Sequence, residues 1–128
     1  MDTPSPERLD ENARALLTAA CHHLGPQGQI LMQQARRARV VASSPTMIDV
    51  DVPTTEPLLD LPDGPIAGRL LVVTADELSG EILIWVRSGR LIGLEQAWYT
   101  DSAPAGWPQP SQLEWTHQNR PTSGDDAR

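Results

Sequence analysis

Residues 80–101, GEILIWVRSGRLIGLEQAWYTD, decide the fold that this sequence predicts. Two runs rich in β-branched and aromatic residues flank Ser88-Gly89, and two such runs joined by two residues ending in glycine are typical of a β-hairpin. With Ser88-Gly89 as the turn and an unbroken ladder, Trp85 lies opposite Ile92. Both faces of this hairpin are apolar near the turn, so each face needs a cover.

Upstream of the hairpin, an amphipathic helix is predicted over residues 5–24. Apolar side chains recur every three or four residues between Leu9 and Leu24, which is the spacing of one helical stripe. Gly25-Pro26 ends this helix, because glycine accepts the left-handed cap conformation and proline cannot continue the hydrogen-bond ladder. Residues 27–36 are predicted to form a second, short helix.

Three further segments have the composition of strands. Residues 37–42, 47–52 and 66–75 are rich in branched aliphatic side chains, and the proline-rich segment before the last of them predicts a loop. We therefore expect a single α+β domain over residues 1–116, with an N-terminal helix and a short second helix packed on an antiparallel sheet of about five strands. Residues 117–128 are expected to form a disordered tail.

The composition excludes several functional classes. The chain of 128 residues has a net charge of -7, which argues against nucleic-acid binding because phosphate backbones require a basic surface. Its single cysteine excludes an intrachain disulfide. No apolar run is long enough to span a bilayer, and the acidic N-terminus is unlike a signal peptide. We expect a cytoplasmic protein that binds neither membranes nor nucleic acids.

An uncovered apolar face is the main functional prediction. The helix at residues 5–24 has one apolar stripe and can cover one face of the hairpin. The other face is predicted to contact a protein, either a second copy in a homodimer or a separate partner, unless the chain's own C-terminal tail covers it. The residues expected to take part in this contact are Ile82, Ile84, Trp85, Val86, Leu91, Glu95 and Trp98.

A small ligand-binding protein or enzyme is the alternative. Glu95 lies inside an apolar run and could be a general acid or base, with Asp101 as a second group and Trp98 beside them in a pocket. The structural interpretation of Glu95 is a hydrated carboxylate or one paired with Arg69. Acid–base chemistry usually needs a second well-placed group, so no residue is assigned a catalytic role.

Metal and cofactor sites are not predicted. Cys21, His22 and His23 are adjacent, but neighbouring residues of a helix point about 100° apart and cannot easily hold one ion. The chain contains no nucleophile elbow and no glycine-rich phosphate loop.

The hairpin GEILIWVRSGRLIGLEQAWYTD, followed by prolines and a short LEW segment, resembles the C-terminal hairpin of small uncharacterised bacterial proteins. In those proteins an N-terminal helix precedes a segment similar to ARVVASSPTMIDVDV here, so the resemblance covers roughly residues 8–115 and implies a helix-then-sheet order. It implies no activity or cofactor. Small helix-plus-sheet proteins also resemble some immunity proteins that neutralise toxins, which is a second alternative function.

Overall fold

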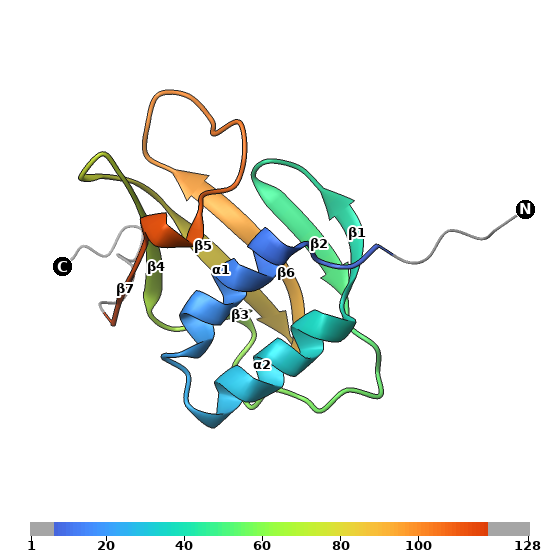
Figure 1. Cartoon of the computed structure of the whole chain (residues 1–128). Helices are drawn as coiled ribbons and strands as arrows, with labels where there is room; N and C mark the ends of the chain where they lie inside the picture. The colour runs from blue at the N-terminus through green and yellow to red at the C-terminus, as the bar shows by residue number, and fades with distance from the viewer. Residues whose placement is uncertain (1–6, 118–128) are drawn as a thin grey trace, which may run out of the picture.

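The computed structural model describes residues 7–117, which form two helices packed against an antiparallel sheet whose strands differ in length (Figure 1). Helix α1 (Glu11–Cys21) begins after Asp10, whose side chain accepts a 2.7 Å hydrogen bond from the Ala13 amide. This carboxylate satisfies one of the free N–H groups of the first turn. The predicted start at residue 5 is wrong, because residues 7–10 are not helical. Residues 1–6 lie outside the described part of the chain.

The second helix, α2 (Pro26–Arg37), packs closely against α1. Gly25 precedes it with φ of 60°, and Pro26 occupies its first position, so the helix extends one residue beyond each end of the predicted range 27–36. Gly28 is buried, and a Cβ atom at this position would lie 2.3 Å from the carbonyl oxygen of Cys21. The two helices therefore pack closely because residue 28 has no side chain.

Within residues 7–117 the sheet contains seven strands, in the order β1-β2-β6-β5-β4-β7, with β3 paired to β5. All of these pairs are antiparallel, which confirms the α+β class. The number of strands exceeds the predicted five because two short strands form in or after proline-rich segments. Each of these two pairs with a single neighbouring strand, where a proline costs fewest hydrogen bonds. The strands are β1 (Arg39–Ser43), β2 (Met47–Asp51), β3 (Gly64–Pro65), β4 (Arg69–Thr74), β5 (Glu77–Arg87), β6 (Arg90–Trp98) and β7 (Leu113–Thr116).

The turn between β5 and β6 is the predicted one. Ser88 and Gly89 have φ values of 51° and 75°, which are typical of a type I′ turn, and Arg87 lies opposite Arg90. The Ser88 amide also donates a 2.8 Å hydrogen bond to Asp63 in the preceding loop.

Beyond the turn, the ladder departs from the predicted register. A β-bulge at Ile92 places Trp85 opposite Gly93, and Leu83 then lies opposite Glu95. Side chains alternate between the two faces of a strand, so a shift of one residue moves each of them to the other face. From Gly93 onward, β6 therefore presents the face opposite to the one predicted.

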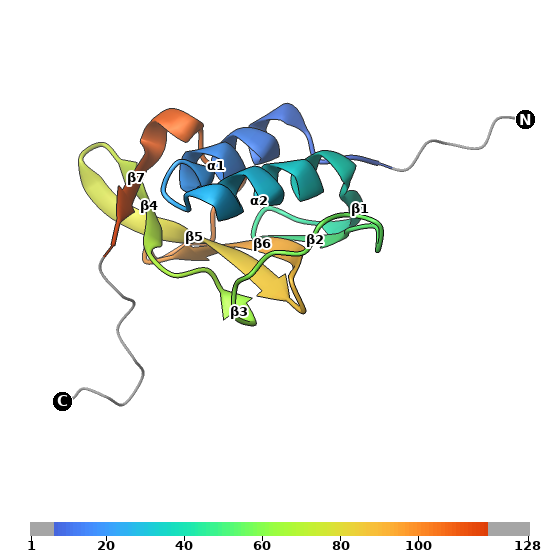
Figure 2. The ribbon, with the colours of Figure 1, turned by 90° about the horizontal axis from the view of Figure 1, so that it is seen from below.

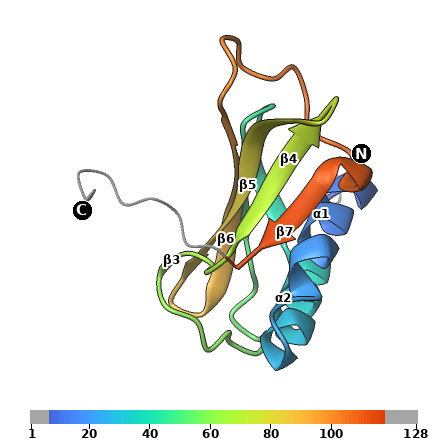
Figure 3. The ribbon, with the colours of Figure 1, turned by 90° about the vertical axis from the view of Figure 1, so that its left-hand side faces the viewer.

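Both helices lie on the same face of the sheet (Figures 2 and 3). Between them and the sheet lies the core, in which Leu16, Leu17, Leu31 and Leu94 are fully buried. Among residues 7–117, no helix covers the opposite face. We call this surface the open face. Its central side chains are all partly exposed, and they are Met47, Leu71, Leu83, Trp85, Glu95 and Ala97.

The C-terminal tail lies beside the helices. Its short 3-10 helix η1 (Pro110–Gln112) and strand β7 both contact α1, and Asn12 of α1 donates a 3.1 Å hydrogen bond to the carbonyl of Pro108. The tail therefore extends the sheet at β4 and leaves the open face uncovered as far as residue 117. The disordered tail was predicted over residues 117–128, of which only His117 lies within the described residues.

A buried amide connects the helical layer to the hairpin. Gln34 of α2 is fully buried, and its Nε2 donates hydrogen bonds to the carbonyls of Pro57 at 2.7 Å and Gly89 at 2.9 Å. Its Oε1 accepts a 2.9 Å hydrogen bond from the Leu91 amide. Gln34 thus joins α2, the loop before β3 and the β5–β6 turn.

Candidate functional site

The predicted contact residues are divided between the two faces of the sheet. Ile82, Ile84, Val86 and Leu91 are each 1% exposed and lie beneath the helices. Contrary to the prediction, these four residues are core residues and are not available to a partner.

A shallow hollow of about 250 Å³ lies on the open face above Gly93. Glycine is required here because a Cβ atom would lie 2.6 Å from the carbonyl oxygen of Ile48. Glu95 borders the hollow, and its carboxylate accepts a 3.0 Å hydrogen bond from Trp85 Nε1. The predicted partner of Glu95, Arg69, is bound elsewhere. The indole of Trp85 is held in place by this bond, so the hollow has a fixed aromatic wall.

Arg69 belongs to a polar cluster at one side of the open face. Its Nη2 lies 3.1 Å from the Glu81 carboxylate and 3.1 Å from the Tyr99 hydroxyl, which itself donates a 2.5 Å hydrogen bond to Glu81. Burial lowers the pKa of Arg69, but hydrogen bonds to Glu81 and Tyr99 outweigh this effect and raise it. Burial and the hydrogen bond to Glu81 raise the pKa of Tyr99. The cluster is therefore an ion pair between Arg69 and Glu81 that is hydrogen-bonded to the neutral phenol of Tyr99.

The predicted pocket of Glu95, Trp98 and Asp101 does not form. Glu95 lies on the open face, whereas Trp98 lines a separate cavity on the helix side, and Asp101 is exposed beyond the end of β6. Glu95 and Trp98 are three residues apart on β6, so the alternation of side chains along a strand places them on opposite faces of the sheet.

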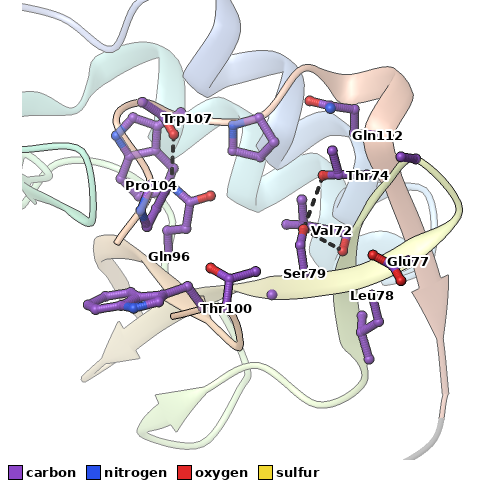
Figure 4. Close-up of a pocket in the computed structure, with 15 residues that line it drawn as sticks. Val72, Thr74, Glu77, Leu78, Ser79, Gln96, Thr100, Pro104, Trp107 and Gln112 are labelled. Atoms are coloured by element: carbon purple, nitrogen blue, oxygen red, sulfur yellow. Dashed lines mark hydrogen bonds between the residues drawn. The ribbon is translucent and has the colours of Figure 1, made fainter. Parts of the chain in front are cut away.

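The cavity on the helix side lies between the β4–β5 hairpin, the end of β6 and the loop before η1 (Figure 4). Its volume is about 490 Å³, which is in the range of small-molecule sites. The main lining residues of this cavity are Val72, Leu78, Gln96, Trp98, Pro104 and Trp107. Neither Gln96 nor Trp107 is among the residues that the sequence predicts for a site. Trp107 fixes the loop in place, because its Nε1 donates a 2.9 Å hydrogen bond to the carbonyl of Ser44.

His23 and His117 make aromatic contacts. His23 stacks on Trp115 of β7, with ring centroids 4.7 Å apart and planes 2° apart, and His117 meets both rings edge-on. These two histidines therefore join the tail to the α1–α2 connection. Within residues 7–117, no group of three or more His, Cys, Asp or Glu side chains is placed to hold a metal ion.

Cys21 is expected to react slowly. Burial raises the pKa of its thiol from 9.0 to about 11. At pH 7 we expect the folded protein to react with iodoacetamide about 100-fold more slowly than the chain in urea, because the thiolate is the nucleophile. Mass spectrometry of the alkylated protein over time would measure both rates, and equal rates would contradict the prediction.

The raised pKa of Cys21 also makes the stability of the protein depend on pH. The pKa of Cys21 is higher in the folded state than the unfolded value of 9.0, so its contribution to stability is complete below pH 9 and is lost as the pH rises toward about 11. A Cys21→Ala variant is expected to lose this part of the pH dependence.

Comparison with known proteins finds no relative of this chain. The chain matches no protein-family description, no curated protein and no solved structure. Among the described residues, neither helix is both long and apolar enough to cross a membrane.

Proposed function

We propose that this protein is a non-catalytic interaction domain that forms a homodimer through the open face. The observation that carries the proposal is a group of partly exposed apolar side chains on four neighbouring strands of this face, which are Met47, Ala97, Leu83 and Leu71. Two carboxylates lie within the group: Glu95 is between Met47 and Leu83, and Glu81, which is ion-paired with Arg69, is between Ala97 and Leu71. Apolar side chains gathered on one exposed face are typical of protein interfaces.

A second copy fits this face because its border carries charges of both signs. Arg39 and Asp51 form an exposed ion pair of 3.3 Å on one side, and Asp49 and Arg87 border the hollow beside Trp85. Two identical patches related by a two-fold axis can bring each cation of one copy to an anion of the other. The hollow above Gly93 provides space for a side chain of the partner.

Substitutions on the open face are expected to separate the dimer. Leu83→Arg places a long charged side chain among the apolar residues, and Ala97→Arg does so without removing a large apolar side chain. We expect each change to weaken dimerisation by about 100-fold or more, because the added side chain would hold the two copies apart and would lose its hydration in the interface, even with Glu95 or Glu81 opposite it. Sedimentation velocity between about 1 and 500 µM would measure the dissociation constant.

The matched control is Val41→Arg at the edge strand β1, where Val41 is 66% exposed. This variant is expected to keep the dissociation constant of the wild type within about threefold, because it changes the sheet edge and leaves the open face intact. Dissociation by Val41→Arg, with Leu83→Arg unaffected, would place the interface at the edge and contradict the proposal. So would a monomer at every concentration. Circular dichroism of each variant would show that it is folded.

Salt dependence separates the homodimer from the rival assignment, an immunity-type protein that binds a toxin. Two copies that each carry a net charge of -7 repel one another, and this repulsion outweighs the small contribution of a few exposed ion pairs at the border, so added salt is expected to strengthen a homodimer. Binding of a basic partner by the same acidic chain would become weaker with salt. Repeating the sedimentation at low and high salt would give opposite trends for the two functions.

A further inference from the structure

The cavity on the helix side holds a polar group that the fold does not use. Gln96 is 5% exposed, and its Nε2 donates to the carbonyls of Pro45 at 2.9 Å and Gly106 at 3.1 Å. These two bonds use both amide hydrogens and set the orientation of the group. Its Oε1 has no hydrogen-bond partner within residues 7–117, and Figure 4 shows it turned into the space between β5 and the loop.

The other polar groups of the wall also offer acceptors. Ser79 donates to the carbonyl of Val72 at 3.2 Å, which leaves Thr74 to donate in the 3.1 Å bond between the two hydroxyls. Thr100 donates to the carbonyl of Ser102 at 2.9 Å. Since each hydroxyl hydrogen is used within the protein, the oxygens that remain toward the cavity can only accept.

Few side-chain donors are left in the lining. The indole of Trp107 is bound to Ser44, so the side chains that can still donate into the cavity are Gln112 and Trp98. Glu77 is the only ionisable side chain among the described lining residues, and it is negative. Trp98, Trp107 and Leu78 supply the apolar part of the wall.

We propose that this cavity binds a small organic amine in its ammonium form. The apolar body of the ligand would lie against the tryptophans, and its N–H groups would donate to Gln96 Oε1 and neighbouring hydroxyl oxygens. A wall with acceptors, aromatic faces and one carboxylate favours a cation that carries hydrogen-bond donors, and it disfavours an anion. The site lies on the side of the sheet opposite to the open face and does not depend on dimerisation.

Three ligands of equal shape test the proposal. Phenethylamine carries the ammonium group, phenylacetate carries a carboxylate, and 2-phenylethanol is neutral. Titration followed by tryptophan fluorescence and by NMR of the indole N–H signals is expected to show phenethylamine binding at least about tenfold more tightly than either analogue. Equal or tighter binding of phenylacetate or 2-phenylethanol would overturn the proposal, and so would the absence of phenethylamine binding at about 10 mM.

Substitutions in the lining of the cavity test whether the amine binds there. Glu77→Gln is expected to weaken phenethylamine binding by about threefold to tenfold, whereas Asp76→Asn, at the neighbouring exposed position outside the lining, should change it by less than about twofold. Gln96→Met removes the acceptor and should weaken binding further. If Gln96→Met does not fold, the ligand series and Glu77→Gln still decide the question. Leu83→Arg on the open face should leave amine binding unchanged, which separates this site from the proposed dimer.

Discussion

Gln34→Leu is expected to lower the free energy of unfolding by about 3–5 kcal/mol. Leucine fills a similar volume but leaves the carbonyls of Pro57 and Gly89 and the amide of Leu91 without their buried partner. Each unpaired buried backbone group costs about 1–3 kcal/mol, which is more than the apolar side chain regains. Urea unfolding followed by tryptophan fluorescence would measure the change.

Gln33→Leu is the matched control for this prediction. It makes the same chemical change at an exposed position of α2, where no hydrogen bond is lost, and we expect an effect within about 0.5 kcal/mol. A loss below about 1 kcal/mol in Gln34→Leu would mean that water or a rearranged loop satisfies the three backbone groups. The β5–β6 turn would then be held by its own residues.

Gly28→Ala is expected to lower the free energy of unfolding by about 2–4 kcal/mol. In an isolated helix the same change stabilises by about 1 kcal/mol, so the sign of the effect tests the packing directly. The new methyl group would lie 2.3 Å from the carbonyl oxygen of Cys21, and α1 and α2 would have to move apart. Thermal unfolding followed by circular dichroism would measure the effect.

For Gly28→Ala, the control is Gln29→Ala, at the next position of α2, which is exposed. Helix propensity alone governs that change, so we expect a small stabilisation of a few tenths of a kcal/mol. If Gly28→Ala also stabilised the protein, the close contact between the two helices would be absent in solution.

Local sequence signals predicted the elements of this fold well. The stripe from Leu9 to Leu24 predicts a helix because amphipathic spacing is a local property, although α1 itself ends at Cys21, three residues before the predicted end at residue 24. Ser88-Gly89 predicts the hairpin turn, since a type I′ turn needs two residues with positive φ. The short strands β3 and β7 were missed, because their sequences are rich in proline or follow it and they exist only where a long strand is present to pair with them.

The candidate sites were predicted less well than the fold. Trp85 and Glu95 lie on the open face, but the four aliphatic residues expected beside them are in the core. Gln96 carries no sequence signal for a role in a cavity. Its amide acquires that role from two carbonyls that are distant in the chain, those of Pro45 and Gly106.

By itself, the sequence determined two helices, the hairpin with its turn, and a sheet with more apolar surface than one helical layer can cover. The tertiary structure alone decided which surface stays uncovered. Along a strand the side-chain period is two, so the single extra residue at Ile92 exchanges the faces of Leu94 and Glu95. That bulge is stabilised by contacts distant in sequence, such as Gly93 against the backbone of Ile48 and Leu94 beneath the helices, and a local pattern does not contain them.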